Sequence, residues 1–360
     1  MGRIKCPRIK KPRVLFILKK HEVYGTCMGL NKSSGLQNSA EFVSEMLIAQ
    51  GFESAVVTVV DNNDIDREVS QFKPDVVMIE ALWVVPEKFD VLKKLHPNVK
   101  WVVRVHSNVP FLANEGIAIG WMRGYSQRGV MVASNSLKAF EDFKSLDLSL
   151  IYLPNYYPDA ALSRKRYAST SGVLNVGCFG AIRPLKNQLS QAIAAIRFAR
   201  ENNLLLRFHV NASRVEDNGS SVLKNLRALF TYGSRELVEH DWQEHEAFLN
   251  LLDEMDIVLS VSLSETFSIA TADAVSRRIP VVTSSEVAWI DPEVMASPTD
   301  TQDIAEKMVV ALNKHERLCQ SNIKRLERFS QEAKDIWTEY LGVEKKQTLL
   351  AKTFNWFLTA

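Results

Sequence analysis

The sequence lacks the features that mark several common classes of protein. Only four of its 360 residues are cysteines, and their positions match neither a disulfide framework nor a zinc site. No apolar run approaches the ~20 residues that are needed to cross a bilayer, and the run 14–18 is too short for a signal peptide. These absences argue against a small secreted scaffold or a membrane-spanning protein, and they predict a cytoplasmic location.

The chain also has little excess charge of either sign. Its formal net charge is +2, whereas a nucleic-acid-binding protein usually has a clear basic excess. The first twenty residues are the exception, because they contain eight lysines and arginines and no acid. We interpret this segment as a solvated terminus. The alternative is a basic arm that contacts an anionic acceptor or a membrane surface.

What the sequence does contain is a regular alternation of short apolar runs and longer amphipathic ones. Apolar residues make up 46% of the chain, and the short runs are rich in valine and isoleucine, as in parallel sheets that are covered on both faces. Strands are predicted at Val14–Leu18, Ala55–Val60, Asp75–Glu80, Trp101–His106 and Val130–Ser134, and then at Leu174–Phe179, Leu205–Val210, Leu237–His240, Ile257–Val261 and Val281–Thr283.

This alternation predicts an α/β protein with two Rossmann-like, doubly wound domains that face each other across a cleft, where such folds bind ligands. We expect a first domain at 1–155, a linker at 156–172 and a second domain at 173–330, because the stretch 154–171 has two prolines and several tyrosines and interrupts the alternation. The remaining residues, 331–360, are expected to form a helical segment that crosses back to the first domain and ends in an aromatic tail at 354–357.

The segment after the predicted strand 257–261 carries two carboxylates beside a helix start. Glu265 lies in the strand-to-helix loop, and Asp273 follows eight residues later, which returns to about the same helix face. The N–H groups of Thr266, Phe267 and Ser268 are the free donors of a helix start and suit a phosphate. The alternative is that Glu265 merely complements the helix dipole and that Asp273 is an ordinary polar residue.

This segment resembles the pattern of the retaining glycosyltransferases of family 4, which have the two-Rossmann GT-B fold. The matching residues are Glu265, Thr266, Phe267, Ser268, Ala274, Pro280, Val281 and Val282. The family has a second glutamate where this chain has Asp273, and that position grips the ribose hydroxyls of the nucleotide. Aspartate keeps the charge and shortens the reach, so donor geometry and donor identity stay open.

A second motif follows the predicted strand 174–179. There Gly180 is followed by Arg183 and Lys186, two cations three residues apart ahead of a helix. The pair resembles the family's phosphate-binding motif, which implies that both side chains bind the diphosphate; two surface cations are the alternative. By the same resemblance Asn211, at the end of a strand, contacts the nucleotide. Trp242 is interpreted as a core residue, with stacking on the base as the alternative.

On the acceptor side, His106 ends a predicted strand and resembles the family histidine that touches the transferred sugar; a histidine bonded within the core is the alternative. The glycine-containing segment 24–36 loosely resembles the family's flexible loop, and a plain surface loop is the alternative. The catalytic residues implied by the resemblance are therefore His106, Arg183, Lys186 and Glu265.

The resemblance implies a hexosyl- or pentosyltransferase that uses a nucleoside-diphosphate sugar, with a UDP-sugar as the first expectation. It also implies retention of configuration, with no metal ion and no other cofactor. The expected acceptor is a carbohydrate or a lipid-linked glycan. A second acceptor class is hydroxymethylated bases in phage DNA, because segments 80–83 and 109–115 loosely resemble glycosyltransferases of large tailed bacteriophages. The alternatives are a sugar-nucleotide epimerase on the same fold and a non-catalytic nucleotide- or sugar-binding module.

Overall fold

The computed structural model describes residues 11–20, 35–158, 172–216 and 218–342. Of the segments discussed above, the glycine-containing segment up to residue 34, most of the expected linker and the aromatic tail therefore lie outside the described residues, as does the first half of the basic segment at the start of the chain.

The first domain is built on a six-stranded parallel sheet with the strand order β2-β1-β3-β4-β5-β6. Its central strand β1 has five consecutive buried residues, Val14 to Leu18, as a strand covered on both faces requires. The strands are β1 (Arg13–Lys19), β2 (Glu53–Val59), β3 (Val76–Glu80), β4 (Lys100–Val105), β5 (Met131–Ser134) and β6 (Leu150–Tyr152).

Helices cover both faces of this sheet. One face packs against α1 and the end of α12, and the other against α2, α3, α5 and α6. The sequence pattern missed β6 and α4, which have only three and four residues, and it also missed α5. The helices are α1 (Gly35–Ala49), α2 (Ile65–Phe72), α3 (Lys88–Leu95), α4 (Val109–Leu112), α5 (Ala118–Gln127) and α6 (Leu137–Phe143), with a 3-10 turn η1 (Lys144–Leu146).

The second domain is built on a five-stranded parallel sheet with the order β11-β10-β7-β8-β9. Its strands are β7 (Val173–Gly177), β8 (Leu205–Asn211), β9 (Arg235–His240), β10 (Ile257–Ser260) and β11 (Val281–Thr283). Its helices are η2 (Pro184–Lys186), α7 (Gln188–Glu201), α8 (Gly219–Leu229), α9 (His245–Leu252), α10 (Ile269–Ser276), η3 (Pro292–Val294) and α11 (Thr301–Asn313). The predicted fold class, two doubly wound α/β domains, is confirmed.

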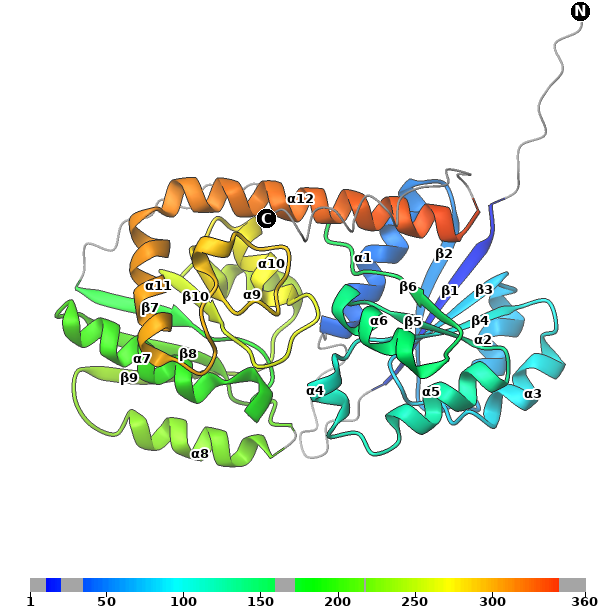
Figure 1. The fold of residues 1–360 in the computed structure, drawn as a ribbon, viewed down its shortest axis with the longest axis horizontal. Helices are drawn as coiled ribbons and strands as arrows, with labels where there is room; N and C mark the ends of the chain where they lie inside the picture. Colours follow the sequence, from blue (N-terminus) through cyan, green and yellow to red (C-terminus); the bar gives the residue numbers. More distant parts are fainter. Residues whose placement is uncertain (1–10, 21–34, 159–171, 217, 343–360) are drawn as a thin grey trace, which may run out of the picture.

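The long helix α12 (His315–Tyr340) lies along both domains (Figure 1). The helix is continuous through residue 331, so residues 331–340 of the expected C-terminal segment are the last turns of a helix that begins in the second domain. Near its end Trp337 is fully buried against the first domain, where its ring lies 5.9 Å from that of Phe16 and its Nε1 donates to the carbonyl of Pro154 at 2.9 Å. The helix therefore fastens the two domains together.

Candidate functional site

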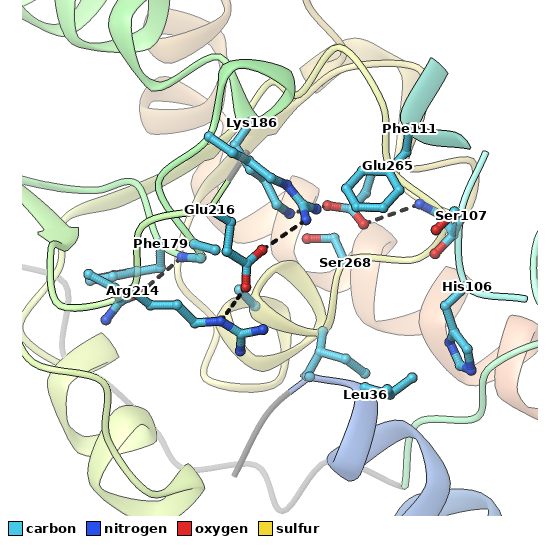
Figure 2. Close-up of a pocket in the computed structure, with 18 of the residues that line it drawn as sticks. Leu36, His106, Ser107, Phe111, Phe179, Lys186, Arg214, Glu216, Glu265 and Ser268 are labelled. Carbon is cyan, nitrogen blue, oxygen red and sulfur yellow. Dashed lines mark hydrogen bonds and ion pairs between the residues drawn. The ribbon is translucent and has the colours of Figure 1, made fainter. Parts of the chain in front are cut away.

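A cavity of about 590 Å³ lies between the two domains, beyond the carboxyl ends of strands β4, β7, β8 and β10. It is the place where the doubly wound fold leaves strand ends and helix starts exposed to a ligand. The structure brings nearly all of the predicted site residues into its wall: His106, Arg183, Lys186, Asn211, Glu265, Thr266, Ser268 and Asp273. Figure 2 shows several of these side chains converging from both domains.

Phe267 is the exception among the predicted residues. Its ring is 1% exposed and packs between Trp289 and Phe329, at centroid distances of 5.6 and 5.2 Å. Its carbonyl accepts a hydrogen bond of 2.9 Å from Trp289 Nε1. The structure therefore places Phe267 in the core beneath the loop, where it anchors the two neighbouring residues that do line the cavity.

The loop between β10 and α10 presents Glu265 to a cation from the other motif. The Glu265 carboxylate forms an ion pair with the Lys186 ammonium, and both side chains are largely buried. Burial would raise the pKa of Glu265, but Lys186 outweighs it, with help from Arg183 and the Thr266 N–H, and holds the pKa below its ordinary value. The two sequence motifs are thus parts of one charged cluster.

Asp273 faces two side chains that the sequence gave no reason to connect with it. Tyr157, just past the first domain, donates its hydroxyl hydrogen bond to Oδ1 at 2.8 Å, and Nε2 of His245 contacts the same oxygen at 2.8 Å. The hydrogen bond with Asp273 raises the pKa of His245 against the opposing effect of burial. Phe42 of α1 packs against both partner rings, so the first domain covers this cluster.

A second charged cluster surrounds Arg183. Glu216 accepts a contact of 3.3 Å from Arg183 and one of 2.5 Å from Arg214 (Figure 2). The Arg183 guanidinium also lies 4.7 Å from the ring centre of Phe111, a residue of the first domain, which fits a cation–π contact across the cleft. The sequence motif located Arg183 but gave no sign of Arg214 or Glu216, which lie beyond the next strand.

Trp242 is not the core residue that we expected. It is partly exposed, lines the cavity, and has the Arg214 guanidinium 4.7 Å from its ring centre. The interpretation of Trp242 as a core residue was wrong, because a large apolar side chain is not necessarily buried. An arginine stacked on a tryptophan at a cavity wall offers a flat surface next to a positive charge.

His106 is held by a buried carboxylate. Its Nε2 contacts Glu80, which is fully buried at the end of β3 and also pairs with the buried Arg104 at 3.2 Å. Asn135 donates a hydrogen bond of 3.1 Å to Nδ1 of His106. Nε2 therefore carries the ring proton and donates a hydrogen bond to the Glu80 carboxylate. Burial and Arg104 lower the pKa of His106 against the pull of Glu80, which keeps the imidazole neutral.

Glu80 is charged in this arrangement. Burial would raise its pKa, but the Arg104 guanidinium and His106 outweigh that effect and hold the pKa below its ordinary value. Arg104 in turn donates to the carbonyls of Leu153 and Pro154, each at 3.0 Å. The histidine is therefore oriented by a chain of contacts that runs back to the connection between the domains.

Contacts across the cleft fix the position of the donor loop relative to the first domain. Asn108 donates to the carbonyl of Glu265 at 2.6 Å, and Asn135 donates to the hydroxyl of Thr266 at 3.1 Å. On the other side of the cavity the Asn211 side chain accepts from the Gly180 N–H at 3.0 Å. Gly180 has a φ of 115°, a left-handed conformation that glycine adopts without strain.

In the described part of the chain, no group of three or more His, Cys, Asp or Glu residues is arranged to hold a metal ion. Asp64 and Asp66 form an Asp-x-Asp pattern, but they pair with Arg67 and His96 and do not line the interdomain cavity. None of the described helices combines the length and apolar character needed to span a bilayer.

Comparisons with known proteins agree with this architecture. No protein-family model and no curated protein sequence matches the chain. Among solved structures, a sucrose-phosphate synthase from Thermosynechococcus elongatus matches with a TM-score of 0.63 at 13% identity, covering 91% of this chain and 98% of that one. Anabaena HepE, solved with UDP and glucose, matches with a TM-score of 0.60 at 12% identity, covering 91% and 96%.

A third similar structure is an α-glucosyltransferase in complex with UDP and a DNA 13-mer that contains an HMU base. It matches with a TM-score of 0.62 at 11% identity and covers 91% of this chain and all of the other, 100%. At such low identities the likeness establishes the fold alone. The chain has the GT-B fold.

Proposed function

We propose that this protein is a glycosyltransferase that moves a sugar from a nucleoside-diphosphate sugar to an acceptor hydroxyl. The observation that carries the proposal is the meeting of two motifs in one cleft of a GT-B fold: Lys186 and Arg183 from one, Glu265 and Asp273 from the other. The two motifs are far apart in the sequence, and largely buried charges that gather in a cleft are typical of functional sites.

The cations and the start of α10 suit the leaving group. As the sugar departs, negative charge grows on the diphosphate, and fixed cations and helix-start N–H groups stabilise it without rearrangement. Arg183 and Lys186 are the ligands we assign, and Arg214, which shares Glu216 with Arg183, joins them. These cations pair with carboxylates in this structure, and the diphosphate replaces those carboxylates as their anionic partner.

The reacting sugar belongs on the first-domain side of the cavity, next to His106. There the imidazole is held neutral and oriented by Glu80 and Asn135. A transition state with positive character on the sugar ring benefits from the buried negative charge of Glu80 behind the histidine. We propose that the acceptor hydroxyl attacks from the face the diphosphate leaves, which retains configuration: the bond from the sugar to the diphosphate breaks, the bond to the acceptor oxygen forms, and the hydroxyl proton passes to the leaving phosphate. Arg183 and Lys186 are proposed to perform the charge stabilisation that a metal performs in other transferases.

The donor is proposed to carry uridine, and the enzyme to transfer a hexosyl group, because one similar structure was solved with UDP and glucose and another is an α-glucosyltransferase solved with UDP. A thermal-shift panel of UDP, GDP, ADP, CDP and dTDP tests this directly, with wild type beside Lys186→Gln. Stabilisation by UDP that is lost in the variant is the expected result. Stabilisation by none of the nucleotides contradicts the proposal, and equal stabilisation of the variant contradicts the assigned site.

The acceptor is proposed to be a carbohydrate or a lipid-linked glycan. One observation favours a second class, because a neighbour covered in full was solved with DNA containing an HMU base. Incubation with a radiolabelled UDP-sugar and either glycan acceptors or hydroxymethylated DNA separates the two by where the label appears. An epimerised nucleotide sugar in the absence of any acceptor contradicts transfer and favours an epimerase.

A further inference from the structure

A second cavity, of about 310 Å³, lies behind the cleft and shares no residue with the cavity described above. We call it the hinge cavity because three parts of the molecule meet there. The end of the first domain contributes Tyr152 and Pro154, the second domain contributes Ala288 and Trp289, and one long face of α12 from Ser321 to Ile336 closes it. Its volume lies at the lower end of the range for small-molecule sites.

The lining of the hinge cavity combines an apolar interior with positive charge. Tyr152, Trp289 and Phe329 supply three aromatic rings. The charged residues among its described lining are three cations and one carboxylate: Lys324, Arg325, Arg328 and Glu332. Arg328 contacts that carboxylate at 3.0 Å, and the described lining holds more cationic than anionic side chains. Such a lining suits a flat or branched apolar body that bears an anionic group.

The floor of the hinge cavity is also the support of the donor loop. Trp289 and Phe329 line the hinge cavity, and both rings pack directly on Phe267. Trp289 additionally donates to the Phe267 carbonyl at 2.9 Å. The residues on either side of Phe267, Thr266 and Ser268, line the cleft. One layer of packed aromatic rings therefore separates an occupant of the hinge cavity from the donor loop.

The opposite wall of the hinge cavity belongs to the support of His106. The carbonyl of Pro154 accepts hydrogen bonds from Arg104 at 3.0 Å and from Trp337 of α12 at 2.9 Å. Arg104 pairs with Glu80, which contacts His106. An occupant that touches both Pro154 and Trp289 bridges the two domains. It does so in the same domain arrangement in which Asn108 and Asn135 contact the donor loop.

We propose that the hinge cavity binds a small anion with an aromatic or branched apolar body, and that its occupation strengthens ligand binding in the cleft. A ligand that fits the hinge cavity favours the domain arrangement in which that cavity exists, and any ligand of the same arrangement gains affinity reciprocally. Ligand binding in the hinge cavity does not depend on the proposed function. Its effect on the cleft rests on the proposed function, because the ligand of the cleft is taken to be a nucleoside diphosphate.

The binding half is tested with 8-anilinonaphthalene-1-sulfonate and its uncharged relative N-phenyl-1-naphthylamine, followed by fluorescence. The expected result is binding of the sulfonate at least tenfold tighter than that of the neutral probe. Ala288→Phe fills the cavity from an exposed position and is expected to abolish binding, and Lys324→Gln to weaken it several-fold. Ala228→Phe and Lys224→Gln, at exposed positions of α8 outside both cavities, are the matched controls.

The coupling half is tested by titrating UDP calorimetrically with and without saturating sulfonate probe. The expected result is an increase in UDP affinity on the order of fivefold in wild type and none in Ala288→Phe. Equal probe binding in Ala288→Phe and wild type, or displacement of the probe by UDP, overturns the site. Unchanged UDP affinity overturns the coupling. Failure of UDP to bind while the probe behaves as expected contradicts the proposed function and leaves the hinge cavity as a binding site.

Discussion

The hydroxyl of Tyr157 donates a hydrogen bond of 2.8 Å to the carboxylate of Asp273. Asp273 is 1% exposed and shares the same oxygen with His245. The position where the resembling family has a glutamate is therefore built around a shorter side chain, with a tyrosine and a histidine that fill the remaining space.

Removing that hydroxyl leaves a buried carboxylate oxygen with one partner fewer. Tyr157→Phe is expected to lower the free energy of unfolding by about 1–3 kcal/mol, because an underpaired buried charge costs more than the bond itself is worth. Urea denaturation followed by circular dichroism measures it. Tyr232→Phe is the control, since Tyr232 is 77% exposed; equal losses in both variants contradict the role of the hydrogen bond.

Lys186 is one of the cations we assign to the diphosphate. Lys186→Gln is expected to weaken UDP binding at least tenfold, since charged hydrogen bonds contribute about 1.5–3 kcal/mol. Isothermal titration calorimetry measures the change, with Lys224→Gln on the exposed face of α8 as the control. Unaltered affinity in Lys186→Gln means that the phosphates lie elsewhere.

Glu216 competes with the ligand for two arginines. Glu216→Gln removes the carboxylate from Arg183 and Arg214, so UDP affinity is expected to rise by roughly two- to fivefold, the value of a partly exposed ion pair. Glu236→Gln, which breaks an exposed pair with Arg207 outside the cleft, is the control. A fall in affinity for Glu216→Gln indicates that the carboxylate orients the arginines and that its competition with the ligand is minor.

The pKa of His245 is raised in the folded state, chiefly by its hydrogen bond to Asp273. The folded protein therefore holds this proton more tightly than the unfolded chain does. The stabilisation is fully present below the ordinary pKa of 6.5 and is lost as the pH rises through the raised pKa. The difference in unfolding free energy between wild type and His245→Gln is expected to shrink from pH 6 to pH 9; a constant difference refutes the shift.

His209 has the opposite behaviour. Burial, with the charges of His240 and Arg207, lowers its pKa from 6.5 to about 4. As the pH falls from 6.5 to about 4, the unfolded chain binds a proton at this histidine that the folded protein does not bind. The free energy of unfolding therefore decreases. Wild type is therefore expected to lose unfolding free energy more steeply than His209→Gln between pH 6.5 and pH 4, in urea titrations at each pH. Parallel curves contradict this.

The strands were predictable because their residues carry the signal locally. Consecutive buried valines and isoleucines identify β1, β3 and β10 without any knowledge of their neighbours, since a strand covered on both faces needs apolar residues throughout. The strand β6 has only three half-buried residues, and α4 has four residues in all. Elements this short carry too few residues to show a period.

The candidate site was predictable only where its residues lie in one continuous motif. Glu265 and Lys186 were found in this way, and so was the region of Asp273. Glu216 and Arg214 were missed because nothing near them in the chain marks them as partners of Arg183. Phe267 matched a motif, yet its ring packs in the core. A motif specifies residue types and does not specify where a side chain points.

By itself the sequence determined the α/β class, the two domains and the two charged motifs, since each depends on patterns within a few tens of residues. Only the tertiary structure decided what those motifs face. It placed Tyr157 and His245 on Asp273, Glu80 behind His106, and α12 across both domains. Residues far apart in the chain meet because parallel strands end at the same edge of each sheet and the two domains face each other, and no local pattern encodes that meeting.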